Sequence, residues 1–364
     1  MKIGVDVRSI SGTGRGVSHY AVSLLREMTQ QGDDWRFLQT GRHDFVLPEG
    51  IRGEVEHIRT PNKLLNAAMA LTKRPRVDTL LGGLDVVFAP NFGFLPIGPD
   101  VPLVVTVHDL SFETHREFYS RREQIWHRFV RPRGIVQRAN RLIAVSEQTK
   151  QELIDLYGVS AEKIAVVHSG IDARFVPATA KQRETLRHKF RLPERFILYI
   201  GALEPRKNVP LLVDAWRVAK QRGLRAELVL AGPAAERIRA AFGDDVTTLG
   251  YVDDALMPAL YSEATAVALV SHHEGFGFPP LEALACGTPS VVSDLPVFSE
   301  TLGAAAVRVP KDDIAQLADA LVNLEGDERM RQQLLAQGAA VISRLTWQHA
   351  AEATYAAITE AAHA

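Results

Sequence analysis

The feature that most constrains the fold is the passage from an apolar strand into a proline-containing helix between residues 264 and 287. Ala264–Val270 is an apolar run typical of a strand, and the segment Gly275–Pro280 follows with two glycines and two prolines. Glycine allows tight turns and close approach of a ligand, and proline suits the first turn of a helix. We expect a short helix over Leu281–Cys286, ended by Gly287. A strand, a glycine loop and a helix N-terminus together form an anion-binding arrangement.

Two carboxylates bracket this loop, Glu274 at its start and Glu282 in the expected first helical turn. Taken singly, Glu282 is explained as an acid that stabilises the helix dipole and Glu274 as a solvated loop residue. The combined pattern E-x7-E, with G-F-G-F-P inside it, is much more specific. It resembles the donor-site motif of the retaining glycosyltransferases of the GT-B fold known as glycosyltransferase family 4.

Length and composition place few other limits on function. A chain of 364 residues suits two domains, and its net charge of −1 gives no global indication of nucleic-acid binding. The single cysteine, Cys286, cannot form an intrachain disulfide, which fits the cytoplasm. The N-terminus has no signal-peptide pattern, and no apolar run approaches the ~18–20 residues that span a bilayer. We therefore expect a cytoplasmic protein whose membrane contact, if it has one, is peripheral at the inner face.

The N-terminal part begins with a second strand, glycine loop and helix. Lys2–Val7 is an apolar strand, Ser11–Gly16 is glycine-rich, and Val17–Met28 repeats its apolar residues at helical spacing. Alone, such a loop is equally explained as a tight turn. The resemblance implies that Gly14 and Gly16 line the site, near the donor phosphates or the acceptor.

A buried parallel strand is expected over Leu103–Val107, and it ends at His108. Ligands bind beyond the carboxyl ends of such strands, so His108 is placed to meet a substrate. A capping or core histidine is the ordinary alternative. The segment Val-His-Asp-Leu matches the position where the family has a histidine in contact with the donor sugar.

The stretch His115–Arg141 is basic and aromatic, with eight Arg, two Glu and interleaved Phe, Tyr and Trp. Such a stretch can lie on an anionic lipid surface or hold a phosphate-linked acceptor. A solvated helix face with extended Arg side chains explains it equally well.

The second half offers a cationic pair between a strand and a helix. Arg206 and Lys207 follow the apolar run Arg195–Gly201 and precede a helix expected over Val209–Gln221. A planar guanidinium and a compact ammonium suit a diphosphate. The segment G-x-L-x-P-R-K-N resembles the pyrophosphate-binding segment of the family. Near Tyr251 and Val252, ahead of a capped helix start, the resemblance places the nucleotide base.

The resemblance extends over essentially the whole chain and implies its architecture. We expect an α/β protein of the GT-B type, with two Rossmann-like, doubly wound parallel-sheet domains that face each other across a cleft. Residues 1–175 would form the acceptor domain and 176–345 the nucleotide-sugar domain. A C-terminal helix over 346–364 would cross back to the first domain.

The implied activity is a metal-independent, retaining hexosyltransferase. Arg206, Lys207 and N–H groups of Gly275, Phe276, Gly277 and Phe278 would stabilise the departing diphosphate. His108 and Glu274 would contact the sugar, and Glu282 the ribose. No D-x-D metal motif occurs, so neither a metal nor a cofactor is expected.

The expected partners are a nucleotide sugar and a glycan or lipid-linked acceptor of polysaccharide or lipopolysaccharide assembly. Mannose from GDP-mannose is favoured, while UDP donors with other sugars stay open. A GT-B sugar-nucleotide epimerase and a non-catalytic sugar-nucleotide-binding subunit are alternatives. The spacing of Ser11–Gly16 does not fit a dinucleotide dehydrogenase, which needs G-x-G-x-x-G.

Overall fold

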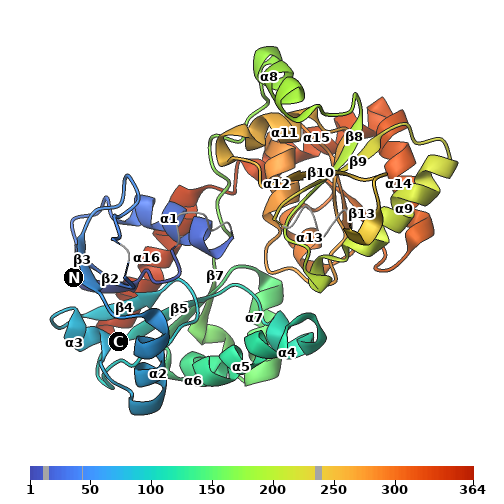
Figure 1. The fold of residues 1–364 in the computed structure, drawn as a ribbon. Coiled ribbons are helices and arrows are strands. Elements are labelled where there is room, and N and C mark those ends of the chain that lie inside the picture. Colours follow the sequence, from blue (N-terminus) through green and yellow to red (C-terminus); the bar gives the residue numbers. More distant parts are fainter. Residues whose placement is uncertain (11–15, 43, 234–239) are drawn as a thin grey trace. The chain divides into compact units, whose positions relative to one another are not determined.

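The protein is seen in a computed structural model that describes residues 1–10, 16–42, 44–233 and 240–364. It consists of two compact units, one formed by Met1–Gly170 together with Thr346–Ala364 and the other by Ile171–Leu345. Each unit has a parallel sheet with helices packed on it (Figure 1). Among the described residues, no helix is long and apolar enough to cross a membrane.

The N-terminal unit contains a seven-stranded sheet in the order β3-β2-β1-β4-β5-β6-β7, with parallel pairing throughout. Its strands are β1 Lys2–Asp6, β2 Asp34–Thr40, β3 Glu54–Ile58, β4 Val86–Ala89, β5 Leu103–Val107, β6 Arg141–Ala144 and β7 Ile164–Val166. Its helices are α1 Val17–Met28, α2 Asn62–Thr72, α3 Val77–Leu80, α4 Ser111–Thr114, α5 Arg121–Val130, α6 Pro132–Arg138, α7 Glu147–Tyr157 and α16 Trp347–His363, with 3₁₀ turns η1 Arg116–Phe118 and η2 Ala161–Lys163.

The C-terminal unit contains a six-stranded parallel sheet in the order β10-β9-β8-β11-β12-β13. Its strands are β8 Phe196–Ile200, β9 Glu227–Ala231, β10 Thr247–Gly250, β11 Ala266–Leu269, β12 Ser290–Ser293 and β13 Val307–Val309. Its helices are α8 Ala180–Phe190, α9 Val209–Gln221, α11 Met257–Glu263, α12 Phe278–Ala285, α13 Pro296–Thr301, α14 Ile314–Gly326 and α15 Glu328–Ile342, with 3₁₀ turns η3 Pro205–Lys207 and η4 Asp254–Leu256.

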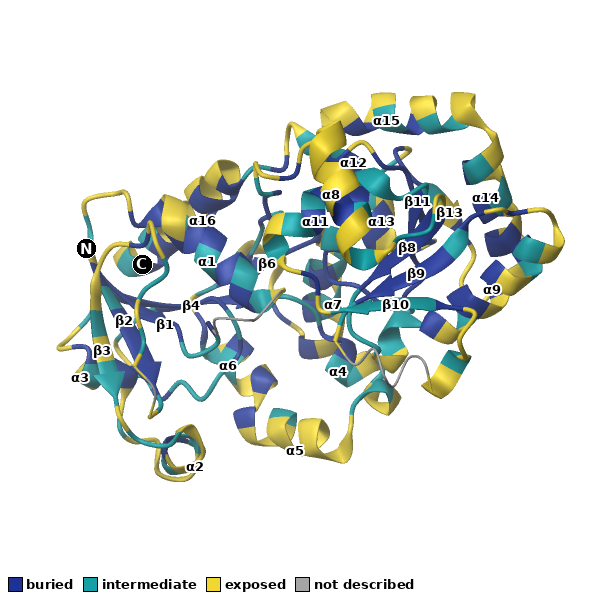
Figure 2. Ribbon diagram, turned by 45° about the horizontal axis from the view of Figure 1, so that its top comes forward, coloured by how far each residue is buried: buried dark blue, intermediate teal, exposed yellow. Residues whose placement is uncertain are grey.

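Both sheets are doubly wound, as the sequence predicts. The central strands β4, β5, β8 and β11 are buried along their whole length, which is why they are continuous runs of apolar residues. Figure 2 shows β4 and β8 in dark blue. The strand order reverses between β1 and β4 in one unit and between β8 and β11 in the other. Ligands of doubly wound sheets bind beyond the strand ends at such a reversal.

The chain leaves the N-terminal unit at Gly170 and returns to it at Thr346, whereas the sequence analysis drew the first boundary at residue 175. A Cβ atom on Gly170 would lie 2.1 Å from the backbone nitrogen of Trp347 and 2.5 Å from the carbonyl carbon of Thr346. The two chain segments can pass this closely only because residue 170 has no side chain. The helix that follows, α16, packs on α1, and its Tyr355 hydroxyl donates a hydrogen bond of 2.5 Å to Asp33.

We predict that Gly170→Ala will lower the free energy of unfolding of the protein by about 2–3 kcal/mol, because the added methyl group meets backbone atoms that cannot rotate away. Denaturant unfolding followed by circular dichroism measures the change. Gly32→Ala is the matched control, since no atom lies within 4 Å of its added Cβ. Equal stability of the two variants would contradict the close approach of Gly170 to the backbone of Thr346 and Trp347.

Candidate functional site

Polar side chains of the C-terminal unit gather where its strand order reverses. The turn η3 follows β8, and the loop 271–277 follows β11, which pairs with β8 in the sheet. The backbone N–H of His272 donates to the carbonyl of Arg206 at 2.8 Å and ties the two loops together. Residues that are 65 or more positions apart in the sequence therefore share one site.

Glu274 is the centre of this cluster and is only 5% exposed. Its Oε1 accepts hydrogen bonds from Lys207 Nζ and from Ser271 Oγ, both at 2.6 Å. Its Oε2 accepts one from Arg206 Nη1 at 3.1 Å, and the same nitrogen donates to the His273 carbonyl at 2.8 Å. Three side chains from two loops are thus held by one carboxylate.

Electrostatics keep this carboxylate ionised. Burial alone would raise the pKa of Glu274, but the charges of Lys207 and Arg206 and the hydrogen bonds from Lys207 and Ser271 outweigh burial and hold the pKa at about 2. Two cations face one buried anion, so the cluster keeps a net positive charge. Glu204 also pairs with Arg206, at 3.3 Å, but it is exposed and therefore screened by solvent.

The helix beside this cluster begins earlier than the sequence indicated. Helix α12 starts at Phe278, so Pro279 and Pro280 occupy its second and third positions and Glu282 lies in its second turn. The expected placement of Glu282 in the first turn is therefore wrong. Because the two prolines have no N–H, most donors for an anion at this end must come from the loop 275–278.

Glycine is required at the start of that helix. Gly277 has a φ of 85°, and a Cβ atom there would lie 2.4 Å from the ring of Phe298. Gly275 and Phe276 are buried, while Phe278 is half-buried with its ring centroid 5.1 Å from that of Phe276. The predicted strand, glycine loop and helix succession is confirmed, with Gly287 in the left-handed region just beyond the helix.

Glu282 projects from α12 and is held by a residue of α11. The hydroxyl of Tyr261, which is fully buried, donates to Glu282 Oε2 at 2.5 Å. Cys286, at the end of the same helix, is buried, and burial followed by the charge of Glu282 raises the pKa of its thiol to about 12. This thiol is therefore unreactive at neutral pH.

The remaining predicted residue pair of this unit follows β10 at the edge of the sheet. Tyr251 is 57% exposed and Val252 is buried. Asp253 accepts a hydrogen bond from the N–H of Ala255 at 2.8 Å, which confirms the predicted helix cap. An exposed aromatic ring at a strand end is available for stacking on a nucleotide base.

His108 and Gly16 belong to the N-terminal unit, and Gly14 lies outside the described residues. His108 directly follows β5, and its Nε2 lies 2.9 Å from the carbonyl oxygen of Pro90. Burial lowers the pKa of this imidazole, so it is neutral, and Nε2 must carry the proton because a carbonyl only accepts. Nδ1 is then a hydrogen-bond acceptor, suited to a hydroxyl group.

The ring of Tyr20 connects the two predicted residues of this unit. It meets the His108 ring edge to face with centroids 4.7 Å apart, and it belongs to α1, which Gly16 precedes with a φ of 71°. A Cβ atom on Gly16 would have no described atom within 4 Å, so the space beside it is open.

Sequence reasoning missed Ser271, Tyr261 and Tyr20, which hold the predicted residues in place. Ser271 stands three residues before Glu274, a spacing short enough to have indicated the hydrogen bond. Tyr261 reaches Glu282 from 21 positions away, and no local pattern indicates this contact. In the part of the chain that the structure describes, no group of three or more His, Cys, Asp or Glu could hold a metal ion.

Comparison with known proteins identifies the family. The model described as "Glycosyl transferases group 1" matches residues 181–340, and the model described as "Glycosyltransferase Family 4" matches residues 14–175. The chain belongs to glycosyltransferase family 4. The resemblance predicted from the E-x7-E pattern is thus confirmed, and the chain is a glycosyltransferase.

Individual relatives agree with this assignment. O-antigen chain mannosyltransferase B of Escherichia coli is 26% identical over 309 residues, which are 80% of this chain and 79% of the relative. Among solved structures, sucrose-phosphate synthase of Thermosynechococcus elongatus has a TM-score of 0.78 at 19% identity, covering 99% of this chain and 98% of the other. HepE of Anabaena, solved in complex with UDP-glucose, has a TM-score of 0.76 at 19% identity, covering 99% and 100%. The predicted GT-B fold is therefore confirmed.

We predict that Glu274→Gln will lower the free energy of unfolding by about 3 kcal/mol at pH 7, since the pKa of the carboxylate falls from 4.5 to about 2 on folding. The sign follows from the depressed pKa: the stabilisation is complete above pH 4.5 and is lost as the pH falls to about 2. Denaturant unfolding between pH 2.5 and 7 should therefore show the two proteins converging in acid.

Glu204→Gln is the matched control, because Glu204 pairs with the same arginine from the surface. It should change stability by less than about 0.5 kcal/mol at every pH. A pH-independent difference between the wild type and Glu274→Gln would show that the charge of Glu274 is not the stabilising factor.

Proposed function

We propose that this glycosyltransferase transfers mannose, with retention of configuration and without a metal ion, from GDP-mannose to a glycan or lipid-linked acceptor of polysaccharide assembly. The observation that carries the proposal is the cluster of Arg206, Lys207 and Glu274 at the strand reversal of the C-terminal unit. The choice of mannose rests on the similarity to O-antigen chain mannosyltransferase B.

The chemistry of sugar transfer explains why a cationic cluster is needed. As the bond from the anomeric carbon to the diphosphate breaks, negative charge grows on the departing nucleotide and positive charge on the sugar. A guanidinium and an ammonium that are already fixed by Glu274 can stabilise the diphosphate without reorganising. Charge neutralisation by Arg206 and Lys207 is the function that a divalent cation would otherwise supply.

The other predicted residues are assigned roles that their surroundings support. Glu282, fixed by the Tyr261 hydroxyl, would accept hydrogen bonds from the ribose, and Tyr251 would stack on the base. Neutral His108 would accept a hydrogen bond from a sugar hydroxyl through Nδ1. Glu274 would stabilise positive charge on the sugar from within its ion pairs and is not assigned as a covalent nucleophile.

The acceptor is proposed to reach the enzyme at a membrane surface. The stretch His115–Arg141 contains helix α5, on which Ile125, Trp126 and Phe129 are exposed to solvent. Exposed apolar side chains among arginines are typical of a helix that lies in a lipid interface. Such contact would bring a lipid-linked acceptor to the protein.

The first test is a calorimetric titration with GDP, UDP, ADP and their sugar conjugates in the presence of EDTA. We expect GDP and GDP-mannose to bind selectively and mannose transfer to persist in EDTA. Selective binding of UDP would contradict GDP-mannose as the donor but not the transferase activity. A strict requirement for Mg²⁺ or Mn²⁺ would refute the metal-free mechanism. Release of an altered sugar without any acceptor would indicate an epimerase.

The second test addresses the cationic pair. We expect Arg206→Ala and Lys207→Ala each to lower kcat by roughly tenfold or more, because each removes a charge that stabilises the leaving diphosphate. Arg217→Ala and Lys220→Ala are matched controls, since these cations pair with exposed acids of the same unit and should leave kcat unchanged. Circular dichroism should show that all four variants are folded. Near-normal turnover of both site variants would refute the assignment.

A further inference from the structure

The N-terminal unit has, besides the basic and aromatic stretch His115–Arg141, a second helix with exposed apolar residues. On helix α2, Leu64 is 65% exposed to solvent and Leu71 is 77% exposed. These two residues are seven positions apart and therefore lie on one face, while Leu65 and Met69 are buried on the adjoining face. A soluble protein rarely leaves such a face uncovered without a function.

The exposed apolar residues of this unit are concentrated on α2 and α5. Among the residues that the structure describes, seven large apolar side chains of the N-terminal unit are exposed, and five of them lie on these two helices. Those on α5 are Ile125, Trp126 and Phe129, and eight of the ten residues of α5 are exposed. Figure 2 shows both helices as largely yellow ribbons on the same side of the unit.

The side chains of Arg8 and Phe94 link the two helices. The buried side chain of Arg8 donates from Nη1 to Asn66 Oδ1 on α2 at 3.2 Å and from Nη2 to the carbonyl of Phe94 at 2.7 Å. The Phe94 ring in turn meets the Trp126 ring of α5 edge to face, with centroids 6.4 Å apart. Asp6 fixes Arg8 through two hydrogen bonds of 2.8 Å. The two helices therefore have a defined relative position and can meet one surface together.

Positive charge surrounds both helices. Residues 62–76 contain four Lys or Arg and no acid, and residues 121–133 contain five Arg and one Glu. These segments carry a net charge of +8 in a chain whose total is −1. Within the described part of the structure, Arg121, Arg122, Arg128 and Arg131 form no ion pair. A cationic surface with apolar side chains complements an anionic lipid bilayer.

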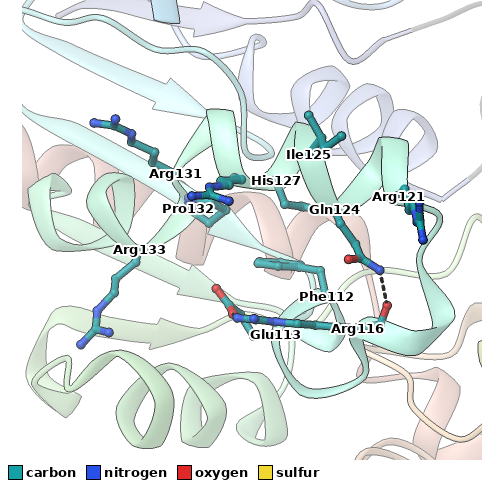
Figure 3. A pocket seen from close by; sticks show the side chains of 11 residues that line it. Phe112, Glu113, Arg116, Arg121, Gln124, Ile125, His127, Arg131, Pro132 and Arg133 are labelled. Atoms are coloured by element: carbon teal, nitrogen blue, oxygen red, sulfur yellow. Dashed lines mark hydrogen bonds and ion pairs between the residues drawn. The ribbon is translucent and has the colours of Figure 1, made fainter.

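A cavity of about 710 Å³ beside α5 provides room for lipid headgroups. Its lining includes Phe112 and five arginines, which are Arg116, Arg121, Arg128, Arg131 and Arg133. Figure 3 labels Phe112 and all of these arginines except Arg128. Its one carboxylate, Glu113, is already bound to Arg116 at 2.7 Å and to the Tyr157 hydroxyl at 3.0 Å. Figure 3 shows the side chains of Arg131 and Arg133 pointing away from the Phe112 ring, where they can reach phosphates outside the cavity.

We propose that α2 and α5 form a two-helix surface that binds an anionic phospholipid bilayer, with Leu64, Leu71, Ile125 and Phe129 inserted between lipids and the surrounding cations on the headgroup phosphates. This surface includes the membrane contact of α5 that belongs to the proposed function, and it rests on the proposed function for that helix. It adds α2 as a second anchor. Two anchors fix the orientation of the unit on the membrane, which one helix alone does not.

The test is flotation of the full-length protein with vesicles of phosphatidylcholine, with or without about a third of phosphatidylglycerol. We expect binding only to the anionic vesicles and weaker binding as salt is raised. The double variant Leu64→Ser/Leu71→Ser on α2 and the variant Phe129→Ser on α5 should each lower the partition coefficient by about fivefold or more. Val46→Ser/Leu156→Ser, which changes two exposed apolar residues elsewhere on the unit, should bind as the wild type does.

Binding of the α2 variant at the wild-type level would overturn the role of α2, and equal binding to neutral vesicles would overturn the electrostatic part of the proposal. Failure of the wild type to float with anionic vesicles would overturn all of it. Nucleotide binding by calorimetry is measured on the same proteins and should be unchanged. Vesicle binding without nucleotide binding would contradict the proposed donor but not the membrane-binding surface. Nucleotide binding without vesicle binding would contradict only the membrane-binding surface.

Discussion

The ion pairs of Glu274 are the interaction on which the candidate site depends. A buried carboxylate is stable only when its charge is compensated, and here compensation comes from Lys207 and Arg206 on a loop that follows a different strand. The same contacts fix both cations in place. The ion pairs with Glu274 thus hold Arg206 and Lys207 in fixed positions, in which both can bind an anion.

This arrangement also accounts for the position of the site in the sheet. Loops after β8 and β11 can reach each other only because these strands are neighbours at the reversal of strand order. The close pairing of Arg206 with the His273 carbonyl, and of His272 with the Arg206 carbonyl, then aligns the two loops along their backbones. A mutation that changed the strand order would therefore remove the site even if all its residues remained.

The strands that lead into the candidate site, β5, β8 and β11, could be predicted because local pattern and tertiary environment agree. β5 is a continuous apolar run because both of its faces are covered. Helix α7 begins at Glu147, directly after Ser146, whose side chain caps the helix by accepting a hydrogen bond from the N–H of Thr149. Predictions were less accurate where tertiary contacts decide the structure. The first turn of α12 is set by the left-handed Gly277 packed against Phe298, which no local pattern reveals. The contact of Tyr261 with Glu282, 21 positions away, is likewise set by the fold rather than by spacing.

Helix α2 shows why total composition is a poor guide to surface chemistry. Its apolar residues are divided between a face that packs on the core and one that does not, so its sequence alone indicates no single burial direction. The net charge of −1 likewise conceals a strongly positive region, because the compensating acids lie elsewhere in the chain. Charge acts over about 10 Å at moderate ionic strength, so a membrane or a ligand responds to the local excess and not to the sum. A net charge of −1 therefore excludes a uniformly basic protein but not a basic surface, and only the fold shows where such a surface forms.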